Sequence, residues 1–257
     1  MPLIKESTYK RAPRYQFNGH LQTVLPDGDF VDLDWVDNRS RNLVLLSHGL
    51  EGNSERHYMM GMANRFSEEG WDVLAWNCRS CSGEMNRKFR LYNHGEIGDI
   101  GEVIGHALQT KDYEKVLLVG FSMGGSILMK YLGVHGNKAA DFPGRLDISK
   151  LDEVGHWRDF DEHYSAPLGG YEDAADFYRQ ASAKNFMGGT DRPILLVNAG
   201  NDPILPPACS PAELCKDHPK LFLERPESGG HVGFTLPGKP YAWSEYRAIQ
   251  FLQDHLN

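Results

Sequence analysis

Residues 116–125 read Val-Leu-Leu-Val-Gly-Phe-Ser-Met-Gly-Gly, and this stretch decides the fold of the chain. A short apolar, β-prone run enters a Gly-x-Ser-x-Gly turn centred on Ser122, and a helix-compatible segment, residues 126–132, follows at once. Strand, tight turn and helix in this order predict a nucleophile elbow, in which the serine hydroxyl stands exposed above a sheet at the positive end of a helix. A glycine-rich turn with a helix-capping serine is the alternative.

The partners that a nucleophilic serine needs follow in the expected order, first an acid and then a histidine. Residues 193–199 have the pattern of a buried strand and run into a Gly-Asn-Asp-Pro turn, so Asp202 lies where open α/β sheets place functional groups. Residues 221–224 predict another short strand, and His231 follows it in a loop flanked by glycines. An Asx turn at Asp202 and a solvated or hydrogen-bonded loop position for His231 are the alternatives.

An oxyanion hole requires two backbone N–H groups aimed at the developing negative charge. The residue after the nucleophile, Met123, supplies one of them in this kind of turn. The other comes from the loop after an earlier strand, which here is the loop at 48–52 following the apolar run 43–47. We assign the second donor to Leu50 and expect His48 to be structural rather than catalytic.

The remaining pattern alternates strands and helices, which is typical of a largely parallel sheet with helices on both faces. Further strands are expected at residues 31–36 and 71–76, and helices at about 55–69, 98–111, 146–154, 173–183 and 243–256. The fold class is therefore α/β.

Several stretches resemble the YheT-like family of α/β-hydrolases, which also includes animal abhydrolase-domain lipases and yeast ethyl-ester-forming acyltransferases. The resemblance covers nearly the whole chain, and its most specific parts are Asn-Gly-His-Leu-Gln-Thr at 18–23 and Arg-Ser-Cys-Ser-Gly-Glu at 79–84. The other matching stretches are 48–52, 77–78, 86–87, 94–96, the elbow, 160–179, 201–203 and 229–234. The resemblance implies an α/β-hydrolase fold with a catalytic triad of Ser122, Asp202 and His231.

Two segments of the family pattern are not visible in the sequence, one between Pro26 and Asp27 and a longer one between roughly residues 136 and 142. Deliberate shortening, natural loss and a sequence that contains only the ordered residues are the alternatives. A doubly wound sheet should deliver another buried strand after the elbow helix, yet residues 139–152 contain no apolar run of strand length. One expected strand and part of the lid are thus not visible in the sequence. If the strand before Asp202 slides over to fill the vacancy, Asp202 moves by one strand spacing, about 4.8 Å, and the triad survives only if its loops adjust.

Composition predicts one enzyme-sized domain over residues 1–257, with a reduced lid or insert at about 137–185. Hydrophobic content is 40%, charged content is 24% and the net charge is −8, with no basic block that would favour nucleic acid. No apolar run reaches membrane-spanning length, and residues 1–6 lack the apolar core that is typical of a signal peptide. Because the four cysteines suggest no disulfide framework, a cytoplasmic location is expected. Cys78 and Cys81 lack partners that would complete a metal set, so no metal or cofactor is expected.

The sequence therefore predicts a serine carboxylic-ester hydrolase that works through an acyl-enzyme on a small-molecule ester. Short-to-medium acyl esters are the expected substrates, because a site without its lid should lack the walls that desolvate a long acyl chain. An alcohol O-acyltransferase with the same triad and a non-catalytic protein on a hydrolase scaffold are the alternatives.

Overall fold

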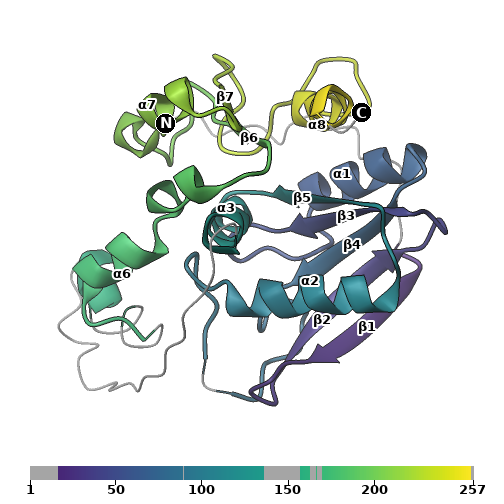
Figure 1. Ribbon diagram of the computed structural model, residues 1–257, viewed down its shortest axis with the longest axis horizontal. Coiled ribbons are helices and arrows are strands. Elements are labelled where there is room, and N and C mark those ends of the chain that lie inside the picture. The colour runs from purple at the N-terminus through teal and green to yellow at the C-terminus, as the bar shows by residue number, and fades with distance from the viewer. Residues whose placement is uncertain (1–16, 89, 136–156, 163–165, 167–169, 256–257) are drawn as a thin grey trace.

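The strands of the computed structural model form two separate sheets (Figure 1). The structure describes residues 17–88, 90–135, 157–162, 166 and 170–255. The larger sheet has the order β1-β2-β4-β3-β5 and the smaller pairs β6 with β7. Their bounds are β1 Gly19–Val24, β2 Phe30–Val36, β3 Asn42–Ser47, β4 Asp72–Asn77, β5 Lys115–Gly120, β6 Ile194–Val197 and β7 Leu221–Glu224.

The larger sheet is mixed. β2 runs antiparallel to both β1 and β4, whereas β3 runs parallel to β4 and β5. β3 and β4 lie inside the sheet and are buried on both faces, which is why their sequences are apolar runs rather than alternating patterns. β5 occupies one edge of this sheet, and its residues are half-buried or exposed.

Helices cover both faces of the larger sheet, as Figure 1 shows. α1 and α8 contribute to one buried cluster with the strands, and α2 and α3 contribute to the other. Their bounds are α1 His57–Glu68, α2 Gly98–Thr110, α3 Met123–His135, α4 Trp157–Phe160, α6 Ala174–Ala181, α7 Ala212–Asp217 and α8 Trp243–His255. Short 3₁₀ turns lie at Ala183–Asn185, Met187–Gly189 and Pro207–Cys209.

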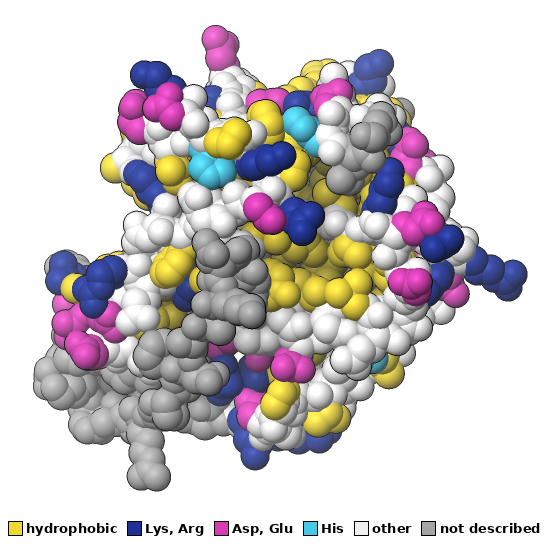
Figure 2. Space-filling view, viewed as in Figure 1, with side chains coloured by type: hydrophobic (Ala, Val, Ile, Leu, Met, Phe, Trp, Pro, Cys, Tyr) yellow, Lys and Arg dark blue, Asp and Glu magenta, His cyan; other side chains and the backbone are white. Residues whose placement is uncertain are grey.

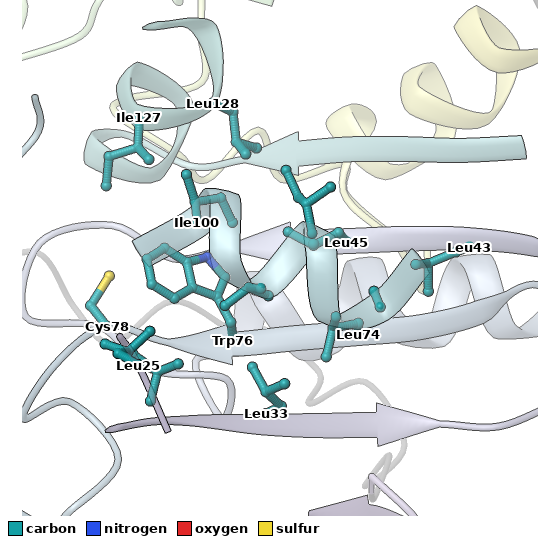
Figure 3. Close-up of a cluster of buried hydrophobic side chains, with 14 of the residues drawn as sticks. Leu25, Leu33, Leu43, Leu45, Leu74, Trp76, Cys78, Ile100, Ile127 and Leu128 are labelled. Atoms are coloured by element: carbon teal, nitrogen blue, oxygen red, sulfur yellow. The ribbon is translucent and has the colours of Figure 1, made fainter. Parts of the chain in front are cut away.

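The core beneath α2 and α3 is built around the indole of Trp76 on β4 (Figure 3). Leu45 and Leu74 lie beside it on the sheet, while Ile100 of α2 and Ile127 of α3 close over them, and all five side chains are at most 2% exposed. Burying a large aliphatic side chain stabilises the fold by roughly 1.5–3 kcal/mol, so this cluster holds the strand that ends at Gly120 firmly under the elbow helix.

Most predicted elements are confirmed, within a few residues at their ends. The sequence analysis did not predict β1. The residues of β1, Gly19–Val24, do not alternate clearly between apolar and polar, so the pattern did not indicate a strand. The helix expected at 146–154 lies outside the described residues. The lid region expected at 137–185 is described only in part, and that part contains α4 and α6.

The strand that the sequence does not show would follow α3, where residues 136–156 lie outside the described residues. In the described part of the chain β5 pairs only with β3, and β6 pairs only with β7. The strand before Asp202 has therefore not moved over to pair with β5. The larger sheet ends at β5, and β6 and β7 continue as a sheet of their own (Figure 1).

Glu245 is a buried carboxylic acid at the start of α8. Its side chain accepts a hydrogen bond from the amide of Ala242 and lies against Gly61 of α1, where a Cβ would come within 2.0 Å of a carboxylate oxygen. Burial raises the pKa of Glu245 to about 7, although the hydrogen bond from Ala242 acts in the opposite direction. The carboxyl is thus held neutral at mildly acidic pH and must ionise at a buried position as the pH rises.

The variant Glu245→Gln is expected to make stability less sensitive to pH. The pKa of about 7 in the folded state lies above the unfolded value, so this group's contribution is fully present below about pH 4.5 and is lost as the pH rises through 7. Urea denaturation should show the wild type losing on the order of 2–3 kcal/mol relative to the variant between pH 4.5 and 8. Glu102→Gln, at an exposed position on α2, is the control. Identical pH dependence in wild type and Glu245→Gln would contradict the assignment.

Candidate active site

Ser122 lies on a strained turn between β5 and α3. Its φ angle is 53°, in the left-handed region, which is costly for a residue with a side chain and is held in place here by the surrounding backbone. A Cβ at position 124 would lie 2.3 Å from the carbonyl oxygen of Ser47, and one at position 120 would lie 2.5 Å from the amide nitrogen of Gly125. Only glycine fits on either side, and the turn leaves Ser122 exposed.

The structure brings the three predicted triad residues together. Ser122 Oγ lies 2.6 Å from His231 Nε2, and His231 Nδ1 lies 2.9 Å from Asp202 Oδ2. The side chains of Asp202 and His231 are 3% and 19% exposed. The first contact is short enough for proton transfer from a nucleophile to a base, and the second is a hydrogen bond that orients the ring.

Asp202 fixes the protonation of the imidazole. Burial alone would raise the pKa of its carboxyl, but the hydrogen bond from His231 and two from the amides of Ile204 and Leu205, at 2.8 and 3.1 Å, leave that pKa below its usual range. An ionised Asp202 accepts a hydrogen bond from Nδ1–H, which leaves Nε2 unprotonated and able to accept a hydrogen bond from the hydroxyl of Ser122.

Asn201 joins the two loops that carry the acid and the base. Its side-chain oxygen accepts hydrogen bonds from the amides of Gly229 and Gly230, at 3.0 and 2.9 Å. The loop after β6 and the loop after β7 thus form one unit with a fixed distance between Asp202 and His231. Sequence reasoning assigned no role to Asn201, and the only available signal was its place beside Asp202 in the turn that follows a strand.

The two predicted oxyanion donors, Leu50 and Met123, line the same cavity as Ser122. Met123 is the first residue of α3, so its N–H has no acceptor within the helix. Leu50 lines the same cavity as Ser122, and the loop before it touches the elbow, since a Cβ at Gly49 would lie 3.3 Å from the Cβ of Ser122. The side chain of Leu50 is 66% exposed, in keeping with a role for its backbone alone.

His48 orients the peptide that carries the Leu50 amide. The fully buried ring accepts a hydrogen bond from the amide of Cys78 at Nε2, 3.0 Å away, so its proton lies on Nδ1, 2.7 Å from the carbonyl oxygen of Gly49. Burial lowers the pKa of His48 and keeps the ring neutral in this arrangement. In a planar trans peptide the C=O and N–H bonds point in opposite directions. Because the Gly49 carbonyl points toward the His48 ring, the Leu50 N–H points away from that ring.

A cavity of about 1890 Å³ contains the triad and continues well beyond it. Ser122 and His231 lie in its wall, and from there it follows β5 on one side and β6 on the other. Figure 2 shows the hydrophobic floor of the hollow between the two parts of the molecule. The expectation of short-to-medium acyl esters assumed a site without apolar walls, and this lining removes the reason for it.

Neither a metal cluster nor a membrane helix is found in the part of the chain that the structure describes. No group of three or more His, Cys, Asp or Glu side chains in this part could hold a metal ion. Likewise, none of its helices is long and apolar enough to cross a bilayer.

Residues 42–142 match the family model of the α/β-hydrolase fold. Over the whole chain, the sequence is 29% identical to YheT of Escherichia coli (strain K12), and the alignment covers 89% of that protein. The chain is thus similar to the YheT protein and carries a match to the α/β-hydrolase fold. The phospholipase ABHD3 of Mus musculus is 26% identical to this chain over 90% of the chain and 69% of its own length.

Solved structures of the same fold include esterases. The esterase Pf2001 of Pyrococcus furiosus superimposes on this chain with a TM-score of 0.66 and 18% identity, over 93% of this chain and 91% of its own. A serine hydrolase of Xanthomonas campestris described as having no lid superimposes with a TM-score of 0.54 and 15% identity, over 92% and 94%. The predicted α/β-hydrolase fold is thereby confirmed.

The variant His48→Phe should lower kcat for an activated ester about 10²-fold and leave KM within a fewfold. Its ring fills a similar space but can neither donate to Gly49 nor accept from Cys78, so the Leu50 amide loses its direction, and one misplaced oxyanion donor costs about 10²–10³ in kcat. Steady-state kinetics measures kcat and KM separately, on protein whose folding has been verified by thermal unfolding. His106→Phe, on α2 and outside the cavity lining, is the matched control. An unchanged kcat in His48→Phe would show that His48 does not position the loop.

Proposed function

We propose that Ser122, His231 and Asp202 form a catalytic triad that hydrolyses carboxylic esters through an acyl-enzyme. The observation that carries the proposal is the 2.6 Å contact between Ser122 Oγ and His231 Nε2, made across two sheets that share no strand. A histidine that only formed hydrogen bonds within its own loop would not be expected to contact the exposed serine that follows the other sheet.

In the first half of the reaction, His231 Nε2 takes the proton of Ser122 as Oγ attacks the acyl carbon. The carbonyl oxygen becomes an oxyanion and accepts hydrogen bonds from the amides of Leu50 and Met123. Asp202 stabilises the imidazolium that forms, without itself taking the proton. His231 then protonates the leaving alcohol, and the acyl group remains esterified to Ser122.

In the second half, water attacks the acyl-enzyme. His231 takes a proton from the water, the oxyanion forms again, and its collapse releases the acid and restores the hydroxyl of Ser122. Ser122 is exposed and the cavity is open to solvent (Figure 2), which favours water over a second alcohol as the acceptor. This openness supports hydrolysis rather than O-acyl transfer.

The variant Ser122→Ala is expected to lower kcat for p-nitrophenyl butanoate by roughly 10³-fold or more, because only binding and the oxyanion hole remain. It should also abolish covalent labelling by a fluorophosphonate probe, detected as a mass increase on the intact protein. Ser126→Ala removes a hydroxyl from the same cavity, one turn along α3, and serves as the control. Activity of Ser122→Ala within tenfold of the wild type would exclude Ser122 as the nucleophile.

A further inference from the structure

We propose that Tyr92 is a positioning residue of the oxyanion hole, in which its hydroxyl fixes the loop that presents the Leu50 amide. The proposal rests on the function proposed for Ser122, because the role exists only if an oxyanion forms beside that serine. It also assigns a purpose to the segment between β4 and α2, whose Arg-Ser-Cys-Ser-Gly-Glu stretch at 79–84 takes no part in the triad.

Two side chains hold the peptide that precedes Leu50. The N–H of Gly49 donates to the hydroxyl of Tyr58, at 3.2 Å. The C=O of Gly49 lies 2.7 Å from His48 Nδ1, which fixes the plane of the peptide that contains the Leu50 N–H. That N–H itself donates to no residue in the part of the chain that the structure describes, so it is free to bind an oxyanion.

Two further side chains hold the residue that follows Leu50. The N–H of Glu51 donates to the hydroxyl of Tyr92, at 3.1 Å, and the C=O of Glu51 accepts from Arg56 Nη2, at 2.7 Å. The contact with Tyr92 fixes the plane of the peptide that joins Leu50 to Glu51. Each of the two peptide planes beside the Cα of Leu50 is therefore held by a side chain from outside the loop.

The conformation of Glu51 requires such a contact. Its φ angle is 54°, in the left-handed region, which is costly for a residue with a side chain and persists only where neighbouring groups impose it. The hydroxyl of Tyr92 accepts from the N–H of Glu51 and lies 3.3 Å from Glu51 Oε1, to which it can donate. Burial raises the pKa of Tyr92, so the hydroxyl keeps its proton at neutral pH. Tyr92 and Leu50 both line the cavity that contains Ser122.

A buried ion pair anchors the segment that carries Tyr92. Arg79 is 2% exposed, and its guanidinium lies 2.9 Å from Asp29 Oδ2 and 2.7 Å from Asp99 Oδ2. Asp29 also accepts a hydrogen bond from the amide of Arg87, at 3.0 Å. Because removing one member of a buried ion pair is strongly destabilising, these contacts keep the start of the segment in one place.

A buried lysine anchors the same segment beyond Tyr92. Lys130 is 8% exposed, and its Nζ donates to the C=O of Gly95 at 2.8 Å. Lys130 belongs to α3, the helix that begins directly after Ser122. The segment is thus fixed to the helix of the nucleophile, and the hydroxyl of Tyr92 carries that fixed position to the loop of Leu50.

The test is the variant Tyr92→Phe, which removes one oxygen atom and keeps the ring. We expect kcat for p-nitrophenyl butanoate to fall about tenfold, less than the roughly 10²–10³-fold cost of losing an oxyanion donor outright. KM should stay within about twofold of the wild type, because an oxyanion forms in acylation and in deacylation and both steps slow together. Steady-state kinetics measures both constants.

Tyr113→Phe is the matched control. The hydroxyl of Tyr113 donates to Asp72 Oδ2 at 3.0 Å, and Tyr113 is half-buried and outside the cavity lining. Both variants lose one tyrosine hydroxyl and its hydrogen bond to a carboxylate, so thermal unfolding should detect a change in both, whereas only Tyr92→Phe should lower kcat. An equal loss of kcat in the two variants would overturn the positioning role.

A double-mutant cycle with His48→Phe tests whether Tyr92 acts through the Leu50 amide. Once His48 no longer directs this amide, the hydroxyl of Tyr92 has little left to position. Tyr92→Phe should then lower kcat less than about twofold in the His48→Phe background, because residues that act on one group are not additive. A second loss of about tenfold in that background would place the effect of Tyr92 elsewhere.

The outcomes separate this proposal from the function on which it rests. If hydrolysis of the ester does not depend on Ser122, the proposed function fails and the role of Tyr92 fails with it. If hydrolysis depends on Ser122 but Tyr92→Phe leaves kcat unchanged, or lowers it equally in both backgrounds, only the role of Tyr92 is overturned.

Discussion

The hydrogen bond between His231 and Ser122 joins two sheets that share no strand. Ser122 belongs to the turn after β5, whereas Asp202 and His231 follow β6 and β7 of the smaller sheet. The acid and the base therefore keep their geometry by belonging to one unit, which Asn201 ties together through its contacts with Gly229 and Gly230. Of the two contacts among Ser122, His231 and Asp202, only the one between Ser122 and His231 links the two sheets, and it is made by the histidine side chain.

The smaller sheet is held in place by helices that pack on both parts. α3 approaches the segment before β6 so closely that a Cβ at Gly133 would lie 2.3 Å from the carbonyl oxygen of Phe186. On the other side, α8 contributes Leu252 to the core of the larger sheet. Arg247 Nε of α8 donates to both carboxylate oxygens of Glu224 on β7, at 2.8 and 3.0 Å, and its Nη2 lies 2.7 Å from one of them. These contacts hold the two sheets together although no strand pairing between them is found in the described residues.

The sequence was sufficient to predict most elements and the proximity of Ser122, Asp202 and His231, because each has a local signature. The elbow is indicated by the glycines that a tight turn requires around Ser122, and Asp202 and His231 each follow a short strand. The separation of the strands into two sheets could not be predicted from the sequence. Whether β6 pairs with β5 depends on long-range packing by α3 and α8. The role of Asn201 could not be predicted for the same reason, because its hydrogen-bond partners lie 28 and 29 residues away in the sequence.

A crystal structure of the protein after reaction with a short-chain fluorophosphonate tests the central claim most directly. The account predicts phosphorus bonded to Ser122 Oγ, a phosphoryl oxygen about 3 Å from the amides of Leu50 and Met123, and β5 and β6 still unpaired. An adduct on another residue, or β6 hydrogen-bonded to β5 with Asp202 out of reach of His231, would contradict it.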